Sequence, residues 1–245
     1  MSHDKIKAAA RERMAVTGER YAAARHEVIR EHRAVGGRGS LPGSAKLLWI
    51  NGPCGVGKTV IASELNRRLP GSVVCDPEDV GYGMLRMLPP APRPRWQDIP
   101  AWRHSVLELL RLALAGHDGP VIAPGTLVDY GHFQEIIGRL RAEGAEVHHF
   151  ALLAEPATVV RRLRARSLGR EPRTQPWETE VLDGWLEQLR RPEFADHVHT
   201  DHRTVAQVAD IVSRSAGMAI KPSTDGPVRT LVHRYATTVR HIHWG

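Results

Sequence analysis

The amino-acid sequence predicts an α/β protein whose core is a five-stranded parallel sheet flanked by helices. Short apolar runs alternate with segments of helical periodicity from residue 46 to residue 219, which is the pattern of repeated strand–helix–strand units. The runs are continuously apolar, as expected for strands buried on both faces of a parallel sheet. A glycine-rich loop separates the first run from the first helix of this region.

The elements follow in order along this region. Strands are predicted at residues 46–50, 72–76, 120–124, 146–154 and 197–200. Helices are predicted at residues 59–69, 101–115, 132–144, 157–169 and 205–217, with a further helical segment at 178–191. A proline-rich stretch at 89–100 leads from the second strand to its helix.

Two appendages flank the sheet domain, which is assigned to residues 46–219. Residues 1–36 are predicted to form a helical hairpin broken at Thr17 and Gly18, and residues 37–45 a flexible linker. Residues 220–245 carry apolar and basic side chains at helical spacing, which predicts a basic amphipathic C-terminal helix. The hairpin is expected to be a surface appendage or an oligomer contact, and the alternative is a nucleic-acid-binding or partner-binding element. The C-terminal helix fits either a membrane surface or docking onto protein.

The amino-acid composition indicates which classes of binding partner and which cellular compartment to expect. Lys and Arg number 34 against 27 acidic residues, and the formal charge of +7 favours anionic small molecules such as nucleotides. The excess is spread along the chain, so nucleic acid is not expected. Two cysteines, Cys54 and Cys75, form no disulfide framework or metal spacing, which predicts a cytoplasmic protein. Peripheral contact with the inner face of the membrane is left open by the C-terminal helix, and the oligomeric state is not determined.

The strongest motif is the glycine-rich loop at residues 52–59, which fits the phosphate-loop pattern G-x-x-x-x-G-K-[ST] between a strand and a helix. Its backbone N–H groups can surround phosphate oxygens, Lys58 can reach the β- and γ-phosphates, and Thr59 can bind Mg²⁺. The motif predicts ATP and Mg²⁺ as cofactors in a nucleotide-kinase-like fold. The predicted ATP-binding residues are Gly52, Cys54, Gly55, Val56, Gly57, Lys58, Thr59, Val60 and, from a later helix, Arg162.

Asp76 ends the second predicted strand, at the sheet edge where ligands of parallel sheets bind. A carboxylate there can accept a proton from a substrate hydroxyl or hold the metal, so Asp76 is a candidate catalytic, substrate-binding and metal-binding residue. A helix-capping or turn role is the alternative, because Pro77 follows. The third strand ends without a carboxylate, and Asp129 follows it at some distance.

Arginines follow the fourth strand, where kinases of this type place a lid. Arg164 and Arg166 are predicted to stabilise charge on the transferred phosphoryl group, together with Lys58. The alternative is a solvated basic helix.

The acceptor substrate is expected between the second and third strands. Trp102 is predicted to stack on a base or sugar, Arg103 to hold an anion, and Thr126 to contact the substrate. Helix packing is the alternative for Trp102.

These motifs, taken together and in this order, resemble the tunicamycin-resistance ATP-binding proteins of the TmrB type, within the P-loop kinase superfamily. The resemblance rests on LLWINGPCGVGKT, CDPEDVGYGMLRMLPP, IPAWR, EIIGRLRAEGAEVHHFALLA, RRLRAR and HTDHRTVAQVAD, and it spans roughly residues 46–243. It implies ATP binding, with Lys58 as the phosphate-binding lysine and Asp76 as the acidic residue, and resistance to a nucleoside antibiotic that carries uracil and N-acetylglucosamine.

Three functions remain open at this point. The protein is expected to phosphorylate tunicamycin, or to sequester it in an ATP-dependent manner without chemistry. Alternatively it phosphorylates another small molecule such as a UDP-sugar, because the architecture is also similar to zeta-type toxins and chloramphenicol phosphotransferases.

Overall fold

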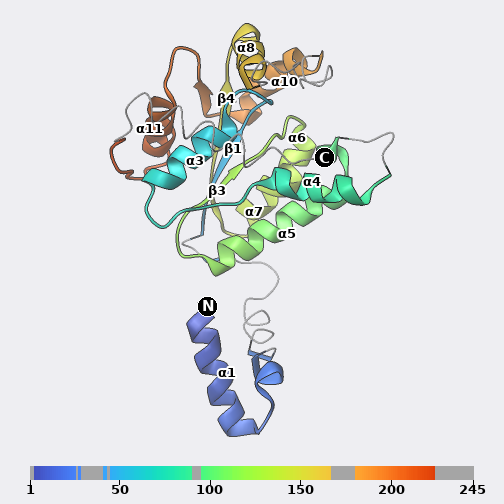
Figure 1. The fold of residues 1–245 in the computed structure, drawn as a ribbon, viewed down its shortest axis with the longest axis vertical. Coiled ribbons are helices and arrows are strands. Elements are labelled where there is room, and N and C mark those ends of the chain that lie inside the picture. Colours follow the sequence, from blue (N-terminus) through green and yellow to red (C-terminus); the bar gives the residue numbers. More distant parts are fainter. Residues whose placement is uncertain are drawn as a thin grey trace.

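A computed structural model describes residues 3–25, 27–28, 41–42, 45–89, 95–166 and 180–223. Its central sheet has five parallel strands in the order β2-β3-β1-β4-β5, which confirms the predicted fold class (Figure 1). The strands are β1 (Lys46–Asn51), β2 (Val73–Val74), β3 (Val121–Pro124), β4 (Glu146–Leu153) and β5 (His197–His199). The central strands β1 and β3 lie side by side, with Leu48 opposite Ile122.

Helices cover both faces of this sheet. In Figure 1, α3 and α11 lie on one side, whereas α4, α5, α6 and α7 lie on the other. The helices are α3 (Lys58–Arg68), α4 (Pro77–Met87), α5 (Pro100–Gly116), α6 (Tyr130–Phe133), α7 (Arg139–Ala142), α8 (Pro156–Arg166), α10 (Leu182–Leu189) and α11 (Val205–Ser215). The short helical turns are η1 (Trp96–Asp98), the π-helical η2 (Gln134–Gly138) and η3 (Pro192–Phe194).

Helix α4 is absent from the elements predicted above. Its N-terminus nevertheless carries several start signals: the Asp76 side chain accepts a hydrogen bond from the Glu78 N–H, Pro77 is the first helical residue, and Glu78 and Asp79 lie in the first turn. Gly81 and Gly83 inside the segment lower its helix propensity. Packing compensates, because Gly81 lies directly against the Trp96 ring.

The N-terminal appendage is helical as predicted. Helix α1 (His3–Thr17) is followed by a turn at Gly18, whose φ is +71°, and by helical residues at 21–25. Ala10 in α1 and Ala24 after the turn are both fully buried. In Figure 1 this hairpin lies apart from the sheet. Most of the predicted linker, and the predicted C-terminal helix beyond residue 223, lie outside the described residues.

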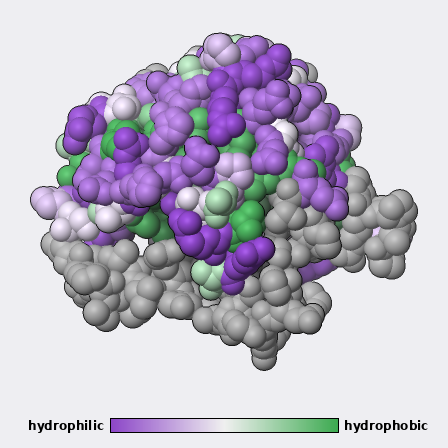
Figure 2. All heavy atoms as spheres, turned by 90° about the horizontal axis from the view of Figure 1, so that it is seen from above, coloured by the Kyte–Doolittle hydropathy of each residue, from purple (hydrophilic) through white to green (hydrophobic). Residues whose placement is uncertain are grey.

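The core consists of apolar side chains on both faces of the sheet, including Leu47, Leu48, Ile122, Phe150 and Leu152. The face seen from above in Figure 2 is mostly hydrophilic, with hydrophobic residues visible between the polar ones. Within the described residues, no helix combines the length and apolar character needed to span a membrane.

Candidate active site

The phosphate loop joins the end of β1 to α3, so that its backbone turns directly beneath a helix N-terminus. Gly52, Gly55 and Gly57 have φ angles of +150°, +81° and +117°, values that side chains disfavour. Val56 N–H donates to the Pro53 carbonyl across the turn. The loop therefore has the conformation and position of an anion-binding cradle.

The loop glycine Gly55 also packs against α8, since a Cβ at this position would lie 2.7 Å from the Leu163 Cγ atom and 3.0 Å from the Val159 Cγ1 atom. We expect Gly55→Ala to weaken AMP-PNP binding and to lower the free energy of unfolding by about 1–3 kcal/mol, because strain and overpacking add. Calorimetry and urea unfolding measure the two effects. Gly83→Ala is the control, because its site in α4 is open. Equal behaviour of both variants would contradict this account of the loop.

Lys58 is the first residue of α3 and only 6% exposed. Its Nζ atom donates to the Pro53 carbonyl at 3.3 Å and lies 3.7 Å from the Glu78 Oε1 atom. The ammonium group is thus held over the loop with a carboxylate as counter-ion. Thr59 and Val60 follow in the same turn, partly exposed.

Asp76 lies close to this cation, at the N-terminus of α4. Its Oδ1 atom accepts a hydrogen bond from the Glu78 N–H at 2.9 Å, so the capping role is real. Burial raises the pKa of Asp76 to about 7; the Glu78 charge adds to the increase and the Lys58 ammonium opposes it. A carboxyl group with a pKa near neutrality suits a residue that exchanges protons. Cap and proton acceptor are therefore compatible roles of one side chain.

Three arginines of α8 are predicted to act at the site, and the structure describes the side chains of Arg162 and Arg164. Arg162 turns toward the loop, where its Nη1 atom donates to the Val56 carbonyl at 2.9 Å and to the Thr200 Oγ1 atom at 2.8 Å. It thereby ties the phosphate loop to the end of β5. Arg164 is exposed on α8, and the side chain of Arg166 lies outside the described residues. Of the two described side chains, the structure brings that of Arg162 to the phosphate loop.

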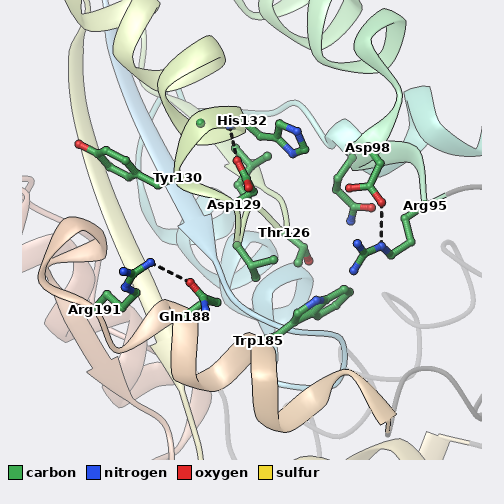
Figure 3. Close-up of a pocket in the computed structure, with 13 residues that line it drawn as sticks. Arg95, Asp98, Thr126, Asp129, Tyr130, His132, Trp185, Gln188 and Arg191 are labelled. Atoms are coloured by element: carbon green, nitrogen blue, oxygen red, sulfur yellow. Dashed lines mark hydrogen bonds and ion pairs between the residues drawn. The ribbon is translucent and has the colours of Figure 1, made fainter.

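A cavity of about 440 Å³ opens next to this machinery. Three segments line it: residues 95–98 around η1, residues 126–132 after β3, and α10 with Arg191, two residues beyond its end (Figure 3). Arg95 is paired with Asp98 at 2.9 Å and lies over the Trp185 ring. On the other side, the Asp129 Oδ1 atom accepts from the His132 N–H at 2.9 Å. The lining thus combines charged groups of both signs with an aromatic surface.

Two predicted substrate residues are corrected by the structure. Trp102 is only 1% exposed and its Nε1–H donates to the Pro77 carbonyl, so its ring has no face for a ligand. Arg103 is 8% exposed and bonds the Glu135 carboxylate at 2.6 Å and the Gln97 carbonyl at 2.8 Å. It therefore holds the η1 wall in place and is already paired.

Thr126 does line the cavity, but its hydroxyl donates to the Gly52 carbonyl at 2.9 Å. That bond joins the cavity wall to the phosphate loop. The predictions missed Glu78 as the partner of Lys58 and missed the cavity side chains Arg95, Tyr130, His132, Trp185, Gln188 and Arg191. Glu78 carried a sequence signal, since it lies two residues after Asp76.

Comparison with known proteins supports a nucleotide-binding, kinase-like P-loop domain. Residues 47–192 match the AAA_33 family, described as an AAA domain. The tunicamycin resistance protein of Deinococcus radiodurans is similar in structure, with 29% identity and a TM-score of 0.60, covering 73% of this chain and 99% of that one. The sequence has no match among the curated proteins.

Two kinases share the fold at lower identity. A gluconokinase from Sinorhizobium meliloti 1021 has 15% identity and a TM-score of 0.53, covering 71% of this chain and 92% of that one. The Mycobacterium tuberculosis APS kinase, solved with AMPPNP and APS, has 18% identity and a TM-score of 0.50, covering 71% and 98%. These two show the fold alone.

Proposed function

Because the chain belongs to the AAA_33 family of AAA domains and has a nucleotide-binding, kinase-like P-loop fold, we propose that it transfers the γ-phosphoryl group of ATP to a hydroxyl of a small molecule. The proposed acceptor is tunicamycin, in line with the similarity to the Deinococcus radiodurans protein. The observation that carries the proposal is the half-buried Asp76 carboxyl beside the Lys58–Glu78 pair, in a site joined to the cavity by Thr126.

In this mechanism Lys58 moves from the Pro53 carbonyl to the phosphate oxygens, and Arg162 keeps the loop in shape. Asp76 accepts the proton of the acceptor hydroxyl. The acceptor oxygen forms a bond to the γ-phosphorus while the bond from that phosphorus to the bridging oxygen breaks, which releases ADP. The Lys58 ammonium stabilises the charge that develops on the phosphoryl oxygens.

Magnesium fits this site through few protein ligands. In the described part of the chain, no three His, Cys, Asp or Glu side chains converge on one point. A Mg²⁺ ion bound mainly by phosphates needs only one or two protein ligands, and Thr59 with Asp76 would supply them. The ion would neutralise charge on the phosphate groups.

A second candidate is ATP-dependent sequestration without chemistry. It is favoured by the end of β3, where Pro124, Gly125 and Thr126 offer no carboxylate, and by Asp129, which is engaged as the cap of α6. An acidic metal partner on the third strand is thus absent from the described residues.

Mass spectrometry of tunicamycin after incubation with the protein, ATP and Mg²⁺ distinguishes the candidates. We expect the drug to gain one phosphoryl group, with one ADP formed for each. Reactions without ATP serve as the control, and UDP-N-acetylglucosamine and chloramphenicol are tested as alternative acceptors. Unmodified drug together with stoichiometric, ATP-dependent binding would favour sequestration, and phosphorylation of another acceptor instead would reject tunicamycin.

A further inference from the structure

Asn51, the last residue of β1, has no exposed surface and uses its whole hydrogen-bonding capacity. Its Oδ1 atom accepts from the N–H groups of Gly52 and Leu127, both at 2.9 Å. Its Nδ2 atom donates to the Leu127 carbonyl at 2.8 Å and lies 3.1 Å from the His149 Nε2 atom. An amide offers two donors and an oxygen with two acceptor positions, so all are occupied.

The side chain of Asn51 continues the hydrogen bonding between the β1 and β3 segments beyond the end of the sheet. Backbone pairing between β1 and β3 closes with the Gly125 N–H bonded to the Ile50 carbonyl. The next residues on the β3 side, 126–129, have no regular structure. Asn51 binds both backbone groups of Leu127 and so extends the ladder by one pair.

His149 fixes the orientation of Asn51 from the neighbouring strand β4. It is 3% exposed, and its ring packs edge-on against Phe133 at 4.8 Å. Because the Asn51 Nδ2 atom can only donate, His149 Nε2 must be the acceptor and Nδ1 must carry the proton. Burial lowers the pKa of His149 to about 3, and a hydrogen bond with the backbone of Ala195 opposes this shift. The ring is therefore neutral.

The two residues whose backbone groups Asn51 binds belong to different sites. Gly52 begins the phosphate loop, whereas Leu127 lines the cavity. The Thr126 hydroxyl reinforces the junction through the Gly52 carbonyl. We propose that Asn51, oriented by His149, is a positioning residue that sets the phosphate loop and the acceptor cavity relative to each other and so couples nucleotide binding to acceptor binding.

The coupling follows from geometry and rests on the proposed function. In-line transfer requires the acceptor oxygen about 3–3.5 Å from the reacting phosphorus, and a small displacement costs much of the rate. A ligand that orders Leu127 also orders Asn51, and through it the Gly52 N–H. Occupancy of one site therefore lowers the cost of ordering the other.

Asn51→Asp tests the proposal with little change of shape. The carboxylate can still accept from Gly52 and Leu127, but it cannot donate to the Leu127 carbonyl or to His149. Calorimetry measures the affinity for tunicamycin with and without AMP-PNP. We expect AMP-PNP to tighten tunicamycin binding about tenfold in the natural protein. In Asn51→Asp this factor should fall close to one, and AMP-PNP alone should bind more weakly.

Nitrogen NMR of the histidine rings supplies a readout without activity. The natural protein should show His149 as a neutral ring protonated on Nδ1, and this form should be lost in Asn51→Asp. His149→Gln, whose carbonyl oxygen can accept from Asn51, should retain the coupling, whereas His149→Leu should lose it. Leu114→Ala is the matched control, because this buried residue lies in the last turn of α5, away from the carboxyl ends of the strands where Asn51 lies. It should lower stability and leave the coupling intact.

Different results test the proposed acceptor and the positioning role of Asn51. If the natural protein binds AMP-PNP but not tunicamycin, the proposed acceptor is wrong. The positioning role then still requires weaker AMP-PNP binding and a changed His149 signal in Asn51→Asp. Unchanged coupling or affinity in Asn51→Asp and His149→Leu, with the same stability loss as Leu114→Ala, would overturn the positioning role.

Discussion

Replacement of Asp76 by Asn is expected to lower the turnover of acceptor phosphorylation by about 10²–10⁴-fold, the usual contribution of a general base. The amide oxygen can still accept from the Glu78 N–H and cap α4, because Asn is as good a cap as Asp. It cannot take the proton of the acceptor. Binding of AMP-PNP and tunicamycin should therefore persist while phosphorylation, measured as ADP release, nearly stops.

The same substitution should stabilise the unliganded protein at neutral and higher pH. The pKa of Asp76 is raised from 3.8 to about 7, so between these values the folded protein holds a proton that the unfolded chain has lost. Stability contributed by this carboxyl is thus complete below pH 3.8 and disappears as the pH rises through about 7. Asn has no proton to lose, so above pH 7 the free energy of unfolding of Asp76→Asn should exceed that of the natural protein by on the order of 1–3 kcal/mol.

Chemical denaturation at pH 5 and pH 8 measures this difference, and the rate of phosphorylation by the natural protein should rise with pH across the same range. Asp79→Asn is the matched control, because Asp79 lies in the same first turn of α4 but is exposed. Full turnover by Asp76→Asn at ordinary Mg²⁺ would remove Asp76 from the mechanism. Partial rescue by high Mg²⁺ would show that lost metal binding, rather than lost proton transfer, lowers the turnover.

Replacement of Lys58 by Ala should weaken AMP-PNP binding by about 2–4 kcal/mol and abolish transfer, because a buried, charge-assisted contact to the phosphates is lost. The loss is not only that of a ligand contact. Glu78 then lacks the cation 3.7 Å away and remains beside Asp76, which leaves two carboxyl groups facing the incoming phosphates. Calorimetry with AMP-PNP and a drug-survival assay measure the two effects.

Lys46→Ala is the control for Lys58→Ala. Lys46 begins β1, at the opposite end of the strand from the phosphate loop, and its ion pair with Glu146 at 3.1 Å is exposed. It should bind AMP-PNP as the natural protein does. Unaltered affinity and resistance in Lys58→Ala would reject the phosphate loop as the nucleotide site.

Local patterns predicted most of the sheet domain, because apolar runs and helical periodicity are properties of short segments. They could not predict the strand order, which places β1 between β3 and β4. Helix α4 was missed because Gly81 and Gly83 weaken its propensity, although the cap signals at Asp76 and Pro77 precede it. In the folded protein, the packing of Gly81 against the Trp96 ring helps to stabilise this helix.

The site was predictable where it lies in one segment. The phosphate loop and Asp76 were found from a motif and a strand end, whereas Trp102 was misjudged although it shares a buried helix face with Val106 and Leu110. The cavity residues could not be found, because residues 95–98 and 185–191 meet only through the fold. Asn51 and His149 are polar residues within apolar strands, and their pairing depends on the alignment of β1 with β4.

One wall of the cavity is separate in sequence from the phosphate loop and Asp76, so the two parts of the site can vary independently. The cavity side chains Arg95, Trp185 and Arg191 come from the segments around η1 and α10, which contribute neither Lys58 nor Asp76. Under the proposed function, substitutions there would change the preferred acceptor and leave Lys58 and Asp76 untouched. A library randomised at these three positions would therefore test new acceptors with the phosphate loop intact, whereas randomisation around Asn51 would have to preserve the junction first.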